Sequence, residues 1–543
     1  MEYSQARRKQ VNDVENPQFN FATGEQYVWG DKDWNAQLGY FGRFNYDYAG
    51  RYLLEANLRY DGTSVFGADQ RWRWYPSFSA GWRVSEEVFM QSIKEAVSAL
   101  KLRASWGKIG DQSVPNSLYV STISSGSTVS WIGGDGNLLN YVGTPTSVAR
   151  DITCQDISTF DIGLDARFLN GELGFTFDWF RRKTENMIVP NQDLTFTYGT
   201  SSLKGNYGNL HTDGWEIGLD YSHQFKNGLR ITANATLSDF KTIIDNYGNV
   251  TGLDSNYKGK RYGDIWGYKV ERLYQKDDFV YDADGNFVKE KVTTGKGAGV
   301  EINKLKDPNA HNQAYLQSGS LVFGPGDVMY KDLDGDGEIT SGSNTIDDHG
   351  DKVVIGNSTP RYQYSFRVGA DWKGFDLSLF FQGVGKCDMW GSSSLTLAGF
   401  NTGDGAIAKR FSTDYWREDR TDAFYPRAVN MGNGTNSFNM CYSDRYLLNM
   451  AYLRLKNITV GYTLPQYLTK KALIQKARIY ASCENLFTWD HLDGTPVDPE
   501  AAVLKTADYE YLTNSSTSNY AGGRVGIGTP AFRTISIGVQ LTF

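Results

Sequence analysis

The feature that most constrains the fold is a two-residue alternation of apolar and polar side chains, repeated in segment after segment. Between Leu38 and Tyr48 the even positions are mostly large and apolar, whereas the odd positions include Arg43 and Asp47. The next segment, residues 52–61, repeats this pattern. Successive side chains of a β-strand point to opposite faces of the sheet, so each segment has one apolar and one polar face.

Many of these segments come in pairs joined by tight turns. The dipeptides Asn170-Gly171, Asn227-Gly228 and Lys373-Gly374 each separate two alternating segments. Such pairs supply the positive φ angles that a tight hairpin turn requires. The chain also ends on an alternating segment, residues 534–543. The sequence therefore predicts an all-β, antiparallel fold built from hairpins.

The connections between the segments are strongly unequal. Long connectors, rich in Gly, Asn, Asp, Ser, Thr and aromatic residues, cover about 109–157, 240–360, 384–450 and 490–532. Long loops at one end and short turns at the other are typical of outer-membrane β-barrels. We expect about fourteen strands, each close to the 9–11 residues that cross a bilayer. An antiparallel β-sandwich is the alternative, but it rarely combines such strands with such unequal loops.

The composition agrees with a membrane barrel and argues against several other classes. Aromatic residues make up 14% of the 543 residues, and Tyr, Trp and Phe near strand ends suit the girdles at a membrane surface. A mean hydropathy of -0.47 is compatible with a barrel, because alternation averages apolar and polar residues. The sequence contains no run of about 18 apolar residues, so it predicts no transmembrane helix. A net charge of -7 argues against nucleic-acid binding.

The sequence offers little for catalysis. The five histidines are scattered, and neither a zinc-protease, a serine-hydrolase nor a nucleotide-binding motif is present. The four cysteines are too widely spaced for a disulfide framework or a zinc site. Charged residues on the polar faces are interpreted as water-facing lining of a lumen; they include Arg43, Glu55, Arg59 and Arg103. We therefore do not expect an enzyme.

One motif resembles the front half of a calcium-binding loop. The segment 332–340 places acidic oxygen donors at loop positions 1, 3 and 5, and glycine at position 6. Ser343 replaces the acidic residue expected at position 12, so a carboxylate further along the chain would have to complete the site. The candidate ligands are Asp332, Asp334, Asp336, Asp347 and Asp348. The alternative is a turn rich in Asp and Gly without a metal, and no other cofactor is expected.

Several motifs resemble those of SusC/RagA proteins, a family of TonB-dependent outer-membrane transporters. They occur in the family's order from about residue 36 to the C-terminus. The clearest are LKLRASWGKIGDQ (100–112), FDWFRRKT (177–184), YLRLKNITVGYTLP (452–465) and NLFT (485–488). The resemblance implies a transmembrane barrel of about 22 strands when complete. It also implies a lumen plug, a SusD-like surface lipoprotein as a lid, energy from a TonB complex, and import of glycans, peptides or other large nutrients through the outer membrane.

Segments that the family carries before its barrel have no counterpart here. Residues 1–9 lack the apolar core of a secretory signal, and neither a TonB-contacting segment nor a plug is recognisable. We therefore expect a partial barrel, about fourteen of 22 strands. Residues 1–35 are interpreted as a lead-in loop, and 36–543 as the C-terminal part of the barrel.

Tryptophans in the long connectors are candidates for contact with a substrate or with a lid protein, since aromatic faces suit both. They are Trp131, Trp266, Trp390 and Trp416. The alternative for each is packing between loops or a place in the interfacial belt.

Two other functions are open. One is a passive porin or adhesin barrel, which the ordered motifs disfavour. The other is a secreted, β-rich glycan-binding protein, which would expose whole apolar strand faces to water. The importer, surrounded by outer-membrane lipid, remains the preferred hypothesis.

Overall fold

The structure is a computed structural model, and it describes most of the chain. The described residues are 2–10, 23–32, 34–112, 114, 119–123, 125–132, 138–145, 148, 151–190, 197, 204–317, 322–391, 409–428, 439, 441–470, 473–500 and 531–543.

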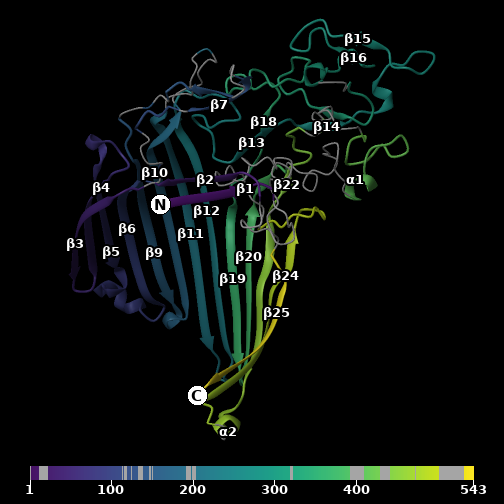
Figure 1. Cartoon of the computed structure of the whole chain (residues 1–543). Coiled ribbons are helices and arrows are strands. Elements are labelled where there is room, and N and C mark those ends of the chain that lie inside the picture. The colour runs from purple at the N-terminus through teal and green to yellow at the C-terminus, as the bar shows by residue number, and fades with distance from the viewer. Residues whose placement is uncertain are drawn as a thin grey trace.

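Thirteen strands of the described residues form one continuous antiparallel sheet, which we call the wall. Figure 1 shows it as a curved surface that runs from β3 to β25. In spatial order its strands are β3 (Gln37–Tyr48), β4 (Tyr52–Thr63), β5 (Trp72–Arg83), β6 (Val97–Asp111), β9 (Gln155–Phe168), β10 (Leu173–Pro190), β11 (Lys204–Gln224), β12 (Arg230–Tyr247), β19 (Arg361–Trp372), β20 (Phe375–Lys386), β23 (Tyr452–Thr463), β24 (Lys476–Asp490) and β25 (Thr534–Thr542). The prediction of a large antiparallel wall is confirmed, with thirteen described strands where about fourteen were expected.

Short turns lie at one end of the wall. Asn170 and Gly171 have φ angles of 55° and 91°, and Lys373 and Gly374 have 48° and 90°. Lys373 and Gly374 form a two-residue turn between the paired Trp372 and Phe375, and their positive φ angles match the right-handed twist of the flanking strands. The β9–β10 turn is longer: Leu169 also has a positive φ of 54°, and the first pair across the turn is Phe168 with Leu173. Two connections at this end are longer, and they contain η3 (Val84–Glu86), η4 (Val88–Ile93) and α2 (Gln466–Thr469).

The strand register separates the wall into an apolar and a polar face. One row of directly paired residues across β9 to β19 consists of Leu164, Phe177, Ile217, Leu237 and Tyr364. The next row along the same strands consists of Gly163, Asp178, Glu216, Ser238 and Gln363. Because adjacent residues of a strand point to opposite faces, the alternation of the sequence becomes two chemically distinct surfaces.

The apolar face ends in charged pairs toward the long loops. Trp179 and Trp215 are directly paired on β10 and β11. The next residues on that face are Arg181 and Asp213, whose side chains form an ion pair with Nε–Oδ1 at 2.6 Å. The apolar stretch from Leu173 to Trp179 covers about 20 Å at a strand rise of about 3.3 Å per residue. This height is comparable with the apolar band of about 25 Å on membrane barrels.

The long connectors are not unstructured. In the described residues they carry small antiparallel pairs and short helices, which Figure 1 shows beyond the loop end of the wall. The strand pairs are β7 (Ser125–Ile132) with β8 (Leu138–Val142), β13 (Asp264–Gly267) with β18 (Val353–Asn357), β14 (Val270–Leu273) with β17 (Val328–Tyr330), β15 (Lys289–Lys291) with β16 (Glu301–Asn303), and β21 (Asp388–Met389) with β22 (Leu448–Asn449). The other helices among the described residues are η2 (Ala68–Gln70), η5 (Leu169–Gly171), η7 (Lys276–Asp278), η8 (Ala314–Leu316) and α1 (Lys409–Thr413). No helix among the described residues is long and apolar enough to cross a membrane.

The lead-in segment differs from the predicted loop. It contains a hairpin of β1 (Glu2–Arg8) and β2 (Gln26–Lys32), paired antiparallel over their full lengths. These strands lack the alternating apolar face of the wall strands, so a hydrophobic pattern could not indicate them.

The two edges of the wall are β3 and β25. Among the described strands β3 pairs only with β4, and β25 only with β24. Every residue of β3 is exposed. Unpaired backbone N–H and C=O groups have no partner in lipid, so an edge in a membrane requires a further strand.

The two faces predict opposite responses to a buried charge. Leu379 lies on the apolar face and is paired with Val368, while the adjacent Ser378 lies on the polar face. In a lipid-inserted protein, Leu379→Arg should lower the free energy of unfolding by about 2–4 kcal/mol. Ser378→Arg is the matched control and should change it by less than about 1 kcal/mol. Urea unfolding in lipid vesicles measures both, and equal effects would contradict the assignment of the faces.

Candidate functional site

The polar face of the wall carries ion pairs that span neighbouring strands. Arg103 donates from Nε to Asp165 at 2.8 Å and from Nη2 to Asp178 at 3.1 Å. Farther along the wall, Arg478 donates from Nε to Asp376 at 2.9 Å. These side chains are partly exposed, so water can reach them. The arrangement suits a hydrated lumen, where exposed pairs orient one another but contribute little to stability.

The polar-face charges predicted from the sequence lie in such pairs. Arg43 is 3.9 Å from Glu55, and Arg59 is 3.1 Å from Asp61. Their structural role is therefore local pairing on the polar face.

The connectors β12–β19 and β20–β23 share one hydrophobic core, which we call the loop core. Its residues come from both connectors, which are far apart in the sequence. They are Tyr268, Leu273, Tyr274, Phe279, Leu316, Phe323, Val328, Met329, Tyr330, Ile339, Phe411, Trp416, Ala423, Tyr425 and Tyr446. The part of the chain that contains this core is called the loop region below.

An ion pair with one buried partner, the carboxylate of Asp327, links the two connectors in the loop core. Asp327 is completely buried, and Arg427 donates to its two carboxylate oxygens at 2.7 Å each. Asn439 donates to Asp327 at 2.7 Å and accepts the backbone N–H of Val328 at 2.8 Å. Because bidentate pairs fix both distance and orientation, Asp327 joins the two connectors in one geometry.

The thiol of Cys441, half-buried against the loop core, is not activated. Cys441 Sγ and the hydroxyl of Tyr330 share a hydrogen bond of 3.0 Å. Burial raises the pKa of Cys441 to about 11 and also raises the pKa of Tyr330. Both groups are therefore neutral near pH 7, and a neutral thiol is unreactive.

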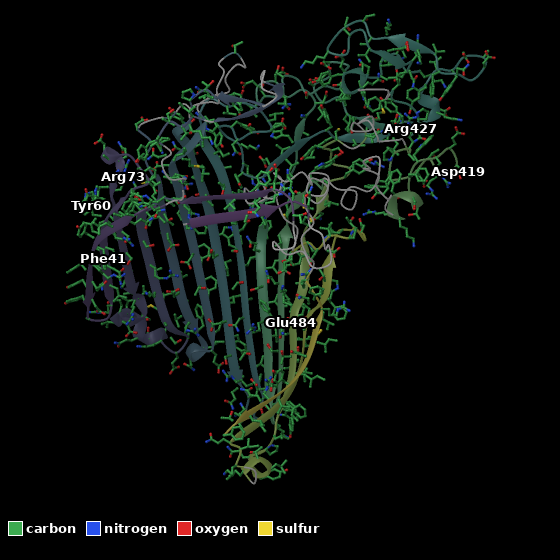
Figure 2. The ribbon with its side chains drawn as sticks, viewed as in Figure 1. Phe41, Tyr60, Arg73, Asp419, Arg427 and Glu484 are labelled. Atoms are coloured by element: carbon green, nitrogen blue, oxygen red, sulfur yellow. The ribbon has the colours of Figure 1, made fainter. Side chains whose placement is uncertain are left out.

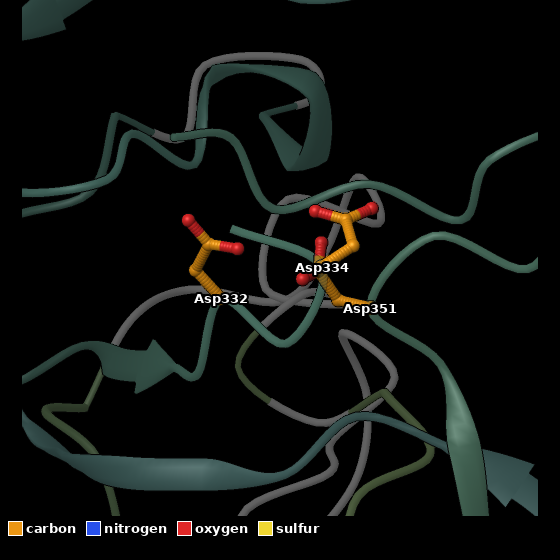
Figure 3. Close-up of side chains that lie close together, drawn as sticks. All are labelled: Asp332, Asp334 and Asp351. Atoms are coloured by element: carbon orange, nitrogen blue, oxygen red, sulfur yellow. The ribbon is translucent and has the colours of Figure 1, made fainter. Parts of the chain in front are cut away.

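Three carboxylates meet beside the loop core. Oxygens of Asp332, Asp334 and Asp351 lie within 4.8 Å of one another, and Figure 3 shows the three side chains around a common point. Asp351 is completely buried, and its two oxygens accept the N–H groups of Leu333 and Thr340 at 2.7 Å each. Burial raises the pKa of Asp351, and the nearby charges of Asp334 and Asp332 raise it further.

The structure brings together two of the five predicted ligands. Asp332 and Asp334 belong to the group, but Asp336, Asp347 and Asp348 do not. Asp336 accepts the N–H of Glu338 at 2.8 Å, and Asp348 accepts the N–H of Ser343 at 2.8 Å. Asp336 and Asp348 also line a neighbouring polar cavity of about 400 Å³.

Asp351 was missed because loop spacing alone pointed to nearer acids. The chain turns at Gly350, with a φ of 53°, directly before Asp351, whose carboxylate lies close to that of Asp332.

The group fits a hard divalent cation. Calcium prefers carboxylate oxygens, and three carboxylates this close repel one another without a cation. Asp332 also accepts the N–H groups of Gly335 and Gly337, at 2.6 and 2.9 Å, which holds the loop around the group.

The four predicted tryptophans differ in their surroundings. Trp416 is only 8% exposed, inside the loop core, and donates to Gln275 at 3.3 Å; this burial argues against a surface contact role for it. Trp390 stacks on Tyr442 with ring centroids 4.7 Å apart. Trp266 donates to the hydroxyl of Tyr257 at 2.9 Å. The side chain of Trp131 lies outside the described part of the chain.

Comparison with known proteins decides the family. The family model "TonB dependent receptor-like, beta-barrel" matches residues 1–486. The chain belongs to the TonB-dependent receptor β-barrel family. TonB-dependent receptor P3 of Formosa agariphila is 27% identical over 513 residues, which cover 93% of this chain and 45% of that protein. TonB-dependent receptor SusC of Bacteroides thetaiotaomicron is 26% identical over 480 residues, which cover 86% of this chain and 41% of that protein.

Solved structures agree on the fold of this TonB-dependent receptor chain. The RagAB peptide transporter matches with a TM-score of 0.66 and 20% identity, over 97% of this chain and 49% of that one. The same importer in an "open-open" state gives a TM-score of 0.67. The predicted SusC/RagA-type barrel is thereby confirmed. The chain spans about half the length of the relatives that it matches.

The buried pair in the loop core predicts a local loss of stability. Asp327→Ala would remove the hydrogen bonds to Arg427 and Asn439 and should destabilise the loop region by about 2 kcal/mol, since the Arg427 side chain is 35% exposed and water can solvate its freed charge in part. The control is Asp419→Ala, whose pair with Arg417 at 3.2 Å is largely exposed and should contribute less than about 1 kcal/mol. Arg427 and Asp419 both lie in the loop region, away from the wall (Figure 2).

Hydrogen exchange of residues 268–281 and 323–340 measures the effect. Equal exchange in both variants would contradict a central role for Asp327.

Proposed function

We propose that this chain forms part of an outer-membrane importer that takes up glycans or peptides with energy from a TonB complex. The observation that carries the proposal is the two-faced wall, with an apolar face that extends about 20 Å along a strand and an ion-paired opposite face that water can reach. Membership of the TonB-dependent receptor family supports it, because that family consists of outer-membrane transporters rather than enzymes.

The other half of the importer must close the wall. Edges β3 and β25 offer unpaired backbone groups, and about nine further strands would complete a barrel of about 22. A plug in the lumen and a TonB-contacting segment belong to the same proposal. The wall alone is not expected to transport, because an open edge in lipid leaves hydrogen bonds unsatisfied.

In the proposed importer the loop region faces the outside of the cell, where the substrate arrives. Its core is rigidly joined by Asp327 and Arg427, and it carries exposed aromatic rings such as Tyr442, which is 50% exposed beside Trp390. Relatives named SusC and RagAB favour a SusD-like surface lipoprotein as partner. We propose that Trp266 and Trp390 lie near this partner or the substrate. A secreted binding protein is disfavoured, because the apolar face would lie in water.

Uptake by intact cells tests the proposed function. Labelled oligosaccharides and labelled oligopeptides are offered to the cells in turn. Deleting the gene at its natural locus should abolish uptake of one of these two classes. Collapse of the proton gradient should have the same effect, because TonB-driven import needs energy. Uptake that persists without the gradient but requires the gene would indicate a passive porin instead.

We also propose that Asp332, Asp334 and Asp351 hold Ca²⁺ in the loop region. Asp334→Asn should weaken calcium binding at least tenfold, whereas Asp347→Asn, outside the group, should leave it unchanged. Because the pKa of Asp351 is raised, protons begin to compete with calcium for its carboxylate at a higher pH than they would at an ordinary Asp. Affinity should therefore fall as the pH is lowered from 7 to 5, as calorimetry on the purified protein can show. No binding at millimolar calcium and pH 7 would overturn the site.

A further inference from the structure

The turn end of the wall is not uniform in charge. In its β3–β10 half, two basic side chains near the turns have acidic partners: Arg51 lies 3.1 Å from Glu87, and Lys94 lies 3.7 Å from Glu86. Arg83, next to Trp82 on β5, lies on the opposite, polar face of the wall. In its β11–β25 half, three turns each carry an exposed lysine: Lys226, Lys373 and Lys470. Within the part of the chain that the structure describes, none of these three lysines has a carboxylate at ion-pair distance.

Each of the three lysines has an exposed apolar neighbour. Lys373 lies over the ring of Trp372, 4.7 Å from its centroid, and Trp372 is 45% exposed. Phe225, next to Lys226, is 41% exposed. Beside Lys470, the short helix α2 exposes 71% of Tyr467 and 50% of Leu468.

This surface continues the apolar face of the wall. Trp372 is paired with Phe375, and the Phe375 ring lies 4.5 Å from that of Tyr462. Figure 1 places α2 at the turn end of the wall, directly after β23. A row of aromatic rings with lysines at its outer limit is the arrangement that binds the boundary between lipid tails and headgroups.

We propose that Lys226, Lys373 and Lys470, with their aromatic neighbours, form a binding surface for the headgroups of anionic phospholipids. This inference rests on the proposed outer-membrane location and adds a preferred lipid on one side of the barrel. Lysines without a carboxylate partner are free to bind phosphate, whereas Arg51 and Lys94 in the other half are already neutralised. The lipid-facing surface of the protein is therefore asymmetric, with anionic lipid held beside β11–β25.

The test uses the protein purified from the outer membranes of its natural host in mild detergent. Native mass spectrometry measures how many molecules of added phosphatidylglycerol and phosphatidylethanolamine remain bound. The natural sequence should retain phosphatidylglycerol preferentially, and high salt should weaken this retention. Each lysine near a membrane surface contributes about fivefold to binding of anionic lipid, so K226Q/K373Q/K470Q should weaken it by up to about a hundredfold.

The matched control removes the same number of charges from the loop region. Lys258, Lys291 and Lys306 are exposed, and in the described residues none of them forms an ion pair. K258Q/K291Q/K306Q should retain phosphatidylglycerol like the natural sequence. Equal retention in both triple variants, or equal retention of the two lipids, would overturn the inference and leave the proposed function intact. Absence of the protein from the outer-membrane fraction would overturn the proposed function as well.

Discussion

Backbone hydrogen bonding between neighbouring strands is the interaction on which the rest of the structure depends. Each described wall strand except the two at the edges is paired on both sides, from β4 to β24. This pairing aligns like residues across strands, so Leu164, Phe177 and Ile217 form one apolar row. In lipid no water can replace a missing partner, and the same requirement makes β3 and β25 the places where further strands must join.

The loop region depends on a different interaction. Its two connectors are separated in the sequence by two wall strands, β19 and β20. Side chains of the loop core, rather than a shared sheet, make much of the contact between the connectors. Asp327 is the point where they meet, because its carboxylate binds Arg427 and Asn439 from the second connector. A buried charge paired in this way excludes alternative packings, since any other arrangement would leave it unsatisfied. The three carboxylates of Asp332, Asp334 and Asp351 lie beside this packed core.

The sequence predicted the wall far better than the loop region. Strict alternation and turns such as Asn170-Gly171 depend on local backbone geometry, so strands and tight turns can be predicted from them without knowledge of the tertiary contacts. The connectors looked like long loops because their apolar residues follow no regular period. Asp336 was predicted as the third carboxylate of the candidate calcium site, and Asp347 or Asp348 as the acid that completes it. The structure instead brings Asp351, which follows the turn at Gly350, beside Asp332 and Asp334. The hairpin of β1 and β2 was missed for the related reason that it has no apolar face.

The sequence by itself determined the antiparallel all-β class, the apolar and polar faces, the position of the tight turns and the family. These properties follow from the side-chain period of two and from local turn chemistry, both of which can be recognised in the sequence. Only the tertiary structure decided that distant connectors share one core, that Trp416 is buried, and that Asp351 joins Asp332 and Asp334. It also decided that three exposed lysines, which have no ion-pair partner among the described residues, lie at turns in one half of the wall. Such contacts depend on packing between residues far apart in the sequence, which no local sequence pattern indicates.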